Sequence, residues 1–215
     1  QLETSYNLEL SFTTDFEWFS TELNVFHNWS NNYIMSQNTG DFYDLDSEKF
    51  IPNCSSGEEC LPVFQATQAN ARFYGYEVQL AFPLWEGEDN QFDMTLFSDF
   101  VRGELVAGGN VPRMPPLRYG FQFDYTGYDA FAAGLRLTRA EAQDHVGENE
   151  TATPGYLLLG ANVSYQVQFA DKYNLLLFVK GNNLLNKTIR NSTSFLKDYA
   201  PEPGRGAEVG LRMSF

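Results

Sequence analysis

Hydrophobic and polar residues alternate with a period of two along most of the chain. A period of two is typical of a β-strand whose two faces meet different surroundings. In the last segment the apolar residues share one parity: Ala207, Val209, Leu211, Met213 and Phe215. The pattern recurs in about nine segments and predicts an all-β protein. These segments are roughly 5–14, 17–37, 71–85, 91–104, 117–126, 129–142, 155–169, 173–186 and 206–215.

Two all-β architectures give each strand one apolar and one polar face. A soluble β-sandwich buries the apolar faces between two sheets. A transmembrane barrel turns them toward lipid and keeps the polar faces around a wet interior. Most of the segments reach the length of about 9–11 residues that a tilted strand needs to cross a bilayer. The periodicity alone fits both architectures.

The connections between the segments distinguish the two architectures. Short turns are predicted at 14–16, 85–90, 127–128 and 170–172, and they alternate with long stretches rich in Gly, Pro and Asn at 38–70, 105–116, 143–154 and 187–205. Short turns at one rim and long loops at the other are typical of outer-membrane barrels. We therefore predict a transmembrane antiparallel up-and-down β-barrel portion with long extracellular loops, in preference to a soluble β-protein.

Charge and motifs narrow the function. The 215 residues include 28 acidic and 14 basic side chains, which give a formal charge of −14. Such a surface repels nucleic acid and is compatible with the capture of cations. No apolar run of about 18 residues predicts a membrane helix, and the first residues do not form a secretion signal. The phosphate-binding loop, H-E-x-x-H and G-x-S-x-G motifs are missing from the sequence, so we expect no enzyme.

The two cysteines of the chain lie six residues apart in the longest predicted loop. Cys54 and Cys60 are expected to form a disulfide in an oxidising compartment. Ligation of a metal by these thiols would need further soft ligands, which the sequence lacks.

Charged residues give two further sets of candidates. Acidic side chains gather in the predicted outer loops, where oxygen ligands suit divalent cations, although the same side chains could form a solvated surface that binds nothing specifically. The candidates for a metal in these loops are Asp44, Asp46, Glu48 and Asp144. The second set occupies the polar positions of the predicted strands, so its members are expected to line the lumen, either in ion pairs across the wall or in contact with substrate. These residues are Glu77, Asp99, Asp124, Arg136 and Lys180.

Five stretches resemble segments of the TonB-dependent outer-membrane receptors. K-G-N-N-L-L-N-K at 180–187 is similar to a strand end of that family, and 194–205, which ends in P-E-P-G-R, is similar to its last extracellular loop. The final residues 208–215 resemble the last strand of these barrels. The remaining similarities are V-P-R-M-P-P-L-R at 111–118 and S-Y-N-L-E-L at 5–10.

This resemblance implies an architecture. Receptors of the family have about 22 strands around a plug, so we expect residues 1–215 to be the C-terminal portion of such a barrel, with Gln1 at the extracellular rim and the plug and earlier strands absent. The implied partners are the remaining strands and plug, TonB through an absent N-terminal region, outer-membrane lipid or lipopolysaccharide, and the barrel-assembly machinery. Phe215 is the expected assembly signal, and it could equally be an ordinary interfacial aromatic residue.

The resemblance also implies a function at the outer membrane of a Gram-negative bacterium. We expect TonB-energised import of a scarce metal or metal chelate, of the zinc or iron-siderophore or haem class, with no resident cofactor. Within the family the chain looks most like zinc-uptake receptors of the ZnuD type, which makes the imidazoles of His27 and His145 candidate ligands; His145 beside Asp144 is the better one. The alternative is a passive or adhesive barrel whose loops contact host or phage without transport.

Overall fold

The structure is a computed structural model that describes residues 1–55, 59–127, 130–169 and 173–215. These ranges form ten strands, and the chain is all-β. Within them, no helix has the length and apolar character to cross a membrane. The strands are β1 (Thr4–Phe16), β2 (Phe19–Asp44), β3 (Lys49–Ile51), β4 (Cys60–Glu86), β5 (Asn90–Leu105), β6 (Arg118–Gly127), β7 (Phe131–Ala140), β8 (Tyr156–Phe169), β9 (Tyr173–Asn182) and β10 (Gly206–Ser214).

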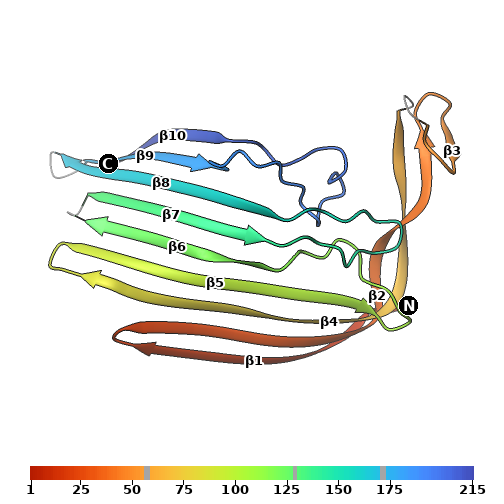
Figure 1. Ribbon diagram of the computed structural model, residues 1–215, viewed down its shortest axis with the longest axis horizontal. Helices are drawn as coiled ribbons and strands as arrows, with labels where there is room; N and C mark the ends of the chain where they lie inside the picture. The colour runs from red at the N-terminus through yellow and green to blue at the C-terminus, as the bar shows by residue number, and fades with distance from the viewer. Residues whose placement is uncertain (56–58, 128–129, 170–172) are drawn as a thin grey trace.

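The strands form one antiparallel up-and-down sheet. Its order is β1-β2-β4-β5-β6-β7-β8-β9-β10, with β3 attached to β2 alone (Figure 1). Each strand of the main path therefore pairs with its neighbour in the chain. In the part of the chain described, β1 pairs only with β2 and β10 only with β9, so the sheet is a curved wall with two open edges. These observations confirm the predicted fold.

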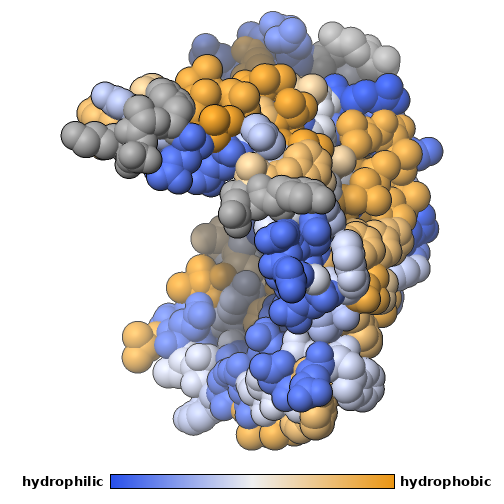
Figure 2. Space-filling model, turned by 90° about the vertical axis from the view of Figure 1, so that its left-hand side faces the viewer, coloured by the Kyte–Doolittle hydropathy of each residue, from blue (hydrophilic) through white to orange (hydrophobic). Residues whose placement is uncertain are grey.

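The two faces of this wall differ in polarity. Figure 2 shows hydrophobic residues along the convex surface and hydrophilic residues on the concave side. On β1 the convex side chains are between 56% and 72% exposed: Tyr6, Leu8, Leu10 and Phe12. A β-sandwich would bury these side chains between two sheets. The alternating apolar side chains instead cover the outside of a single curved sheet, as a membrane barrel requires.

Aromatic rings mark both ends of the convex apolar band. Tyr6 lies opposite Trp29 near one end of β1, and Phe16 lies opposite Phe19 at the other end. Ten residues separate Tyr6 from Phe16, which at about 3.4 Å per residue and a tilt of about 35–45° corresponds to a height of about 24–28 Å. This height matches the apolar band of about 25 Å expected for an outer-membrane barrel.

The longest predicted loop is largely a β-hairpin, which corrects the prediction for residues 38–70. β2 and β4 continue as paired strands from Ser20↔Ala81 to Asp44↔Cys60, with irregular register after Ser30 and after Asn38. We call residues 31–70 the outer hairpin, which projects beyond the other strands in Figure 1. The predicted disulfide between Cys54 and Cys60 is confirmed, with an S–S distance of 2.11 Å.

Residues 31–37 of the outer hairpin lie within the predicted strand 17–37, and only its continuation from residue 38 onward was predicted as a loop. Both of its faces carry Asn, Gln, Thr and Ser side chains, so no alternation develops. A smaller correction concerns the first turn, which lies at 17–18, between β1 and β2, and not at 14–16. The buried apolar residues of the described ranges lie at the end of the wall that carries the long connections, here called the outer end: Met35, Ala71, Val111, Ala140 and Ile189.

Candidate ligand-binding site

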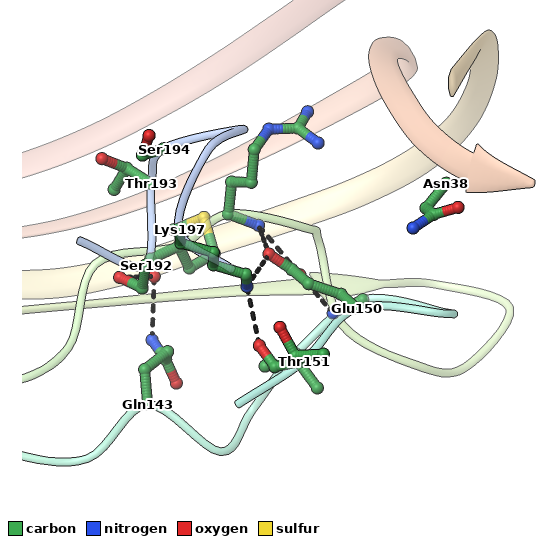
Figure 3. Close-up of polar contacts among 12 residues, drawn as sticks. Asn38, Gln143, Glu150, Thr151, Ser192, Thr193, Ser194 and Lys197 are labelled. Carbon is green, nitrogen blue, oxygen red and sulfur yellow. Dashed lines mark hydrogen bonds and ion pairs between the residues drawn. The ribbon is translucent and has the colours of Figure 1, made fainter. Parts of the chain in front are cut away.

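Three long connections meet at the outer end of the wall. They join β5 to β6 (106–117), β7 to β8 (141–155) and β9 to β10 (183–205). Although these connections are far apart in sequence, polar side chains link them to one another (Figure 3), and further hydrogen bonds link them to the outer hairpin. We call the group formed by Arg113, Gln143, Glu150, Ser192 and Lys197 the loop junction.

A buried ion pair lies at the centre of the loop junction. The Nζ atom of Lys197 is 2.7 Å from Oε1 of Glu150, and the two side chains are 5% and 9% exposed. Lys197 also donates to the carbonyl oxygen of Thr151 at 2.7 Å. The Glu150 carboxylate accepts the backbone N–H of Arg113 at 3.1 Å and that of Gly147 at 2.8 Å. A buried ion pair needs such additional partners to offset its desolvation, and this one joins all three connections.

A proline-rich segment supplies further acceptors. In P-R-M-P-P at 112–116 three residues lack a backbone N–H group, so this segment cannot join a regular strand ladder, and two of its carbonyl oxygens accept from side chains instead. Gln143 donates to the carbonyl oxygens of Met114 at 3.0 Å and Pro115 at 2.8 Å. Ser192 donates to the Met114 carbonyl oxygen at 3.0 Å. Both of these side chains are buried, and they fix the segment at the base of the outer loops.

The outer hairpin is fastened to this junction by paired amides. Nδ2 of Asn38 donates to the backbone oxygen of Asn149 at 3.0 Å, and Nδ2 of Asn149 donates in return to that of Asn38 at 3.2 Å. Gln37 donates to the Glu148 carboxylate at 2.7 Å. The hairpin and the three connections therefore form one linked surface.

A cavity of about 270 Å³ lies between the outer hairpin and the connections, and we call it the outer cavity. The guanidinium carbon of Arg113 lies 4.0 Å from the ring centre of Phe195 and 5.9 Å from that of Phe64. The two rings meet edge to face at 5.0 Å. Because the Arg113 backbone is held by Glu150 in a left-handed conformation, with φ of 56°, its side chain extends toward the rings. Aromatic walls with a few charged groups are typical of small-ligand sites.

The predicted lumen residues share the concave face of the sheet. A second cavity, of about 430 Å³, is lined there by Glu77, Asp99 and Arg136 among other polar residues. Glu77 lies opposite Asp99 in the register, and Asp99 accepts a hydrogen bond from Nε of Arg118 at 3.0 Å. These contacts favour ion pairing within the wall for Asp99 and leave Glu77 facing the cavity.

The other three lumen candidates have neighbours on the same face. Arg136 donates to Gln122 at 2.7 Å and lies 3.8 Å from the ring centre of Phe97. Gln122 donates in turn to Asp124 at 2.7 Å. Lys180 lies opposite Glu208 on β10. That this face lines the lumen of a complete barrel stays a prediction.

The metal candidates are not gathered into one site. No group of three or more His, Cys, Asp or Glu side chains in the described ranges could hold a metal. Nδ1 of His145 lies 2.9 Å from Oδ1 of its neighbour Asp144. Asp44 accepts from the Ser47 hydroxyl and the Asp46 backbone, and these hydrogen bonds hold the pKa of Asp44 below its ordinary value.

His27 lies elsewhere, on the convex face. Its cross-strand neighbours are Leu8 and Tyr74, and its ring centre is 4.0 Å from that of Trp29. Asp46 and Glu48 lie in the turn after β2, apart from the histidines in the register of the sheet. Metal binding by any of these residues stays a prediction, as does the assembly role of Phe215, which is 97% exposed after β10.

Sequence reasoning did not single out the residues of the loop junction. Glu150 and Lys197 lie 47 residues apart in connections without periodicity. The related signals were the stretches at 111–118 and 194–205, which contain Arg113 and Lys197 and did not indicate their roles.

Comparisons with known proteins identify the family. The family described as "TonB dependent receptor-like, beta-barrel" matches residues 1–184. The copper transporter OprC matches with a TM-score of 0.72 and 18% identity, over 99% of this chain and 31% of that one. The FrpB iron transporter from Neisseria meningitidis matches with a TM-score of 0.65 and 13% identity, over 99% of this chain and 30% of that one. The siderophore receptor PirA from Acinetobacter baumannii matches with a TM-score of 0.61 and 19% identity, over 99% of this chain and 32% of that one.

These structures support the fold and not a substrate. The chain spans about a third of the length of each of them. None of the three supports the finer resemblance to zinc receptors. The match over residues 1–184, together with the antiparallel wall and its long outer connections, shows that this chain belongs to the TonB-dependent receptor β-barrel family.

Proposed function

We propose that this chain forms part of the barrel of an outer-membrane receptor that imports a scarce metal or metal chelate with energy delivered by TonB. The observation that carries the proposal is the family match over residues 1–184. Barrels of this family lie in the outer membrane of Gram-negative bacteria and enclose a plug. The matched structures are described as a copper transporter, an iron transporter and a siderophore receptor.

The two cavities suit successive steps of such an import. The outer cavity lies among the outer connections, where its rings and the Arg113 guanidinium would contact an arriving chelate. The polar concave cavity lies farther along the wall, among Glu77, Asp99 and Arg136. A net charge of −14 raises the local concentration of cations. Zinc, copper and ferric chelates all remain candidate substrates of this proposal.

Calorimetry on the intact receptor tests the substrate class. The purified receptor is titrated separately with zinc, with copper and with ferric catecholate and hydroxamate chelates. Uptake of the species that binds is then measured in cells with and without TonB. The proposal expects saturable binding of at least one species and uptake that stops without TonB. Binding of none, or uptake that persists without TonB, contradicts it and favours the passive or adhesive alternative.

A pair of arginine variants tests the outer cavity. Arg113→Gln removes the guanidinium from the two phenylalanine rings, whereas Arg205→Gln removes an exposed arginine from the connection between β9 and β10. Loss of a charged contact to ligand typically costs tenfold or more in affinity, about 1.4 kcal/mol or above. We expect that loss for Arg113→Gln and unchanged affinity for Arg205→Gln in the same titration. Equal affinities of the two variants for the ligand would show that Arg113 does not contact it.

A further inference from the structure

A group of charged side chains lies on the convex, apolar face of the wall, at the outer end of β2, β4 and β5. In the register, Arg72 lies between Trp29 on β2 and Glu104 on β5, and Tyr74 lies opposite Arg102. We call Arg72, Arg102 and Glu104 the convex charged cluster. Charged residues on the lipid-facing side of a barrel are costly near the midplane and tolerated near the interfaces.

The aromatic rings give the depth of this cluster. Arg72 shares its row with Trp29 and Tyr6, the residues that bound the apolar band at its outer end. Rings of this type gather where the hydrocarbon of a membrane gives way to headgroups. The cluster therefore lies at the level of the lipid headgroups in the outer leaflet.

The cluster carries more positive than negative charge. Nε and Nη2 of Arg72 donate to Oε2 of Glu104 at 2.9 and 2.7 Å, and the Tyr74 hydroxyl donates to Oε1 at 3.2 Å. Nε of Arg102 is 3.5 Å from the same carboxylate. One carboxylate thus faces two guanidinium groups, which leaves a net charge of +1. The Arg72 side chain is 54% exposed and its guanidinium remains accessible from the membrane side.

Two buried nitrogen atoms beside the cluster have no hydrogen-bond partner in the described ranges. They are Nε of Arg102 and Nε2 of His27. The other contact of Arg102 is from Nη2 to Oδ1 of Asn110 at 3.3 Å. The Arg102 guanidinium therefore has fewer hydrogen-bond acceptors within the protein than that of Arg72, which donates twice to Glu104.

An apolar groove begins at the cluster and continues toward the middle of the band. It encloses about 970 Å³, with Arg72, His27 and Glu104 at its outer end. The rest of its lining is mainly apolar: Leu8, Leu10, Leu23, Val25, Tyr76 and Phe100. Such a groove, with cationic groups at the headgroup level and a hydrophobic floor below, has the polarity of a lipid molecule.

We propose that this groove binds one phosphorylated lipid of the outer leaflet. An acyl chain lies along the leucine and valine side chains, and a phosphate accepts hydrogen bonds from Arg72 and Arg102. Guanidinium groups match phosphate because their donors bind two oxygens at once. The phosphate competes with Glu104 for the two arginines. The proposal rests on the outer-membrane placement of the barrel and is independent of which substrate the receptor imports.

Native mass spectrometry on the intact receptor tests this site. The receptor is purified in a mild detergent, stripped of lipid, and titrated with bisphosphorylated lipid A as the probe. Arg72→Gln combined with Arg102→Gln removes both guanidinium groups. Arg118→Gln is the matched control, because Arg118 forms a similar cross-strand pair with Asp99 at 2.9 Å on the concave face. Heat-modifiable electrophoretic mobility shows which variants are folded barrels.

We expect the double variant to bind lipid A about tenfold or more weakly and the control to bind it unchanged. Unchanged binding by the double variant, or an equal loss in the control, overturns the proposal. Excess inorganic phosphate should leave the bound lipid in place; displacement would identify a site for free phosphate and overturn the lipid assignment.

A third variant gives a result of opposite sign. Glu104→Gln removes the competing carboxylate, so we expect lipid A to bind about two- to fivefold more tightly. This result decides the matter if the double arginine variant does not fold, because unchanged or weaker binding by Glu104→Gln contradicts the proposal. Metal uptake by the same receptor is a separate readout, so a failure of the import proposal leaves this test intact.

Discussion

At the scale of single residues, Glu150 and Lys197 do most to fix the outer loops. The carboxylate of Glu150 accepts hydrogen bonds from two backbone N–H groups and from the lysine, so it touches all three connections. The lysine in turn holds the carbonyl oxygen of Thr151. The strands of the wall are linked by backbone hydrogen bonds, whereas the three connections are linked to one another through this buried ion pair.

Removal of the lysine should loosen all three connections together. Lys197→Met leaves the Glu150 charge buried without its partner, which typically costs about 3–5 kcal/mol. We expect faster amide hydrogen exchange in 106–117, 141–155 and 183–205, with unchanged exchange in the strands. Lys187→Met, at an exposed lysine of the same connection, is the control and should exchange as the parent does. Faster exchange in only one connection would refute the linkage.

At the scale of elements, the concave face packs phenylalanine rings over glycines of the adjacent strand. Phe26 lies opposite Gly75 and Phe97 opposite Gly120, and a third pair joins β9 to β10. A side chain on Gly120 would overlap the Leu137 carbonyl oxygen and lie 2.8 Å from the Phe97 ring. The missing side chain thus allows strands to approach closely while the ring covers the gap.

This packing predicts the effect of adding one methyl group. Gly120→Ala forces β6 away from β7 or the Phe97 ring out of place, at a cost of about 1–3 kcal/mol. We expect a lower unfolding temperature in detergent, followed by the loss of heat-modifiable mobility. Gly206→Ala is the matched control on β10, where an added Cβ meets nothing within 4 Å. A parent-like unfolding temperature for Gly120→Ala would show that the strands have room for the methyl group.

At the scale of the whole molecule, the described chain is a wall with two faces and two edges. The faces are suited to lipid and to water, but the outer edges of β1 and β10 have no strand partner in the described ranges. Unpaired backbone groups are poorly tolerated in a membrane, where water cannot replace the missing partner. The remaining strands of a complete barrel would pair with these edges.

The chain produced alone should therefore fail to form a discrete barrel. When it is refolded in detergent, we expect edge-to-edge association into mixed oligomers. Analytical ultracentrifugation together with electrophoresis of unheated samples measures this. A monodisperse monomer with heat-modifiable mobility would show that the two edges can close on each other, contrary to this expectation.

The sequence predicted the strands far better than the loops. Leu8 and Leu10 alternate with Asn7 and Glu9 because one face of each strand is suited to lipid and the other to water. This difference between the faces produces an alternation that can be detected in the sequence. The contacts of Arg113, Glu150 and Lys197 leave no such periodic trace, since their partners lie in other connections. The disulfide was predictable for another reason, because Cys60 is the only other cysteine of the sequence with which Cys54 could pair.

The fastening of the outer hairpin has a practical consequence for epitope display. The base of the hairpin is tied to the other loops through Asn38 and Asn149, whereas the turn between β2 and β3 is exposed, with Leu45 at 45%. A foreign peptide grafted near residues 45–49 would be presented to antibodies without disturbing the surface beneath it. The same graft between 141 and 155 would displace Glu150 and alter three other segments at once.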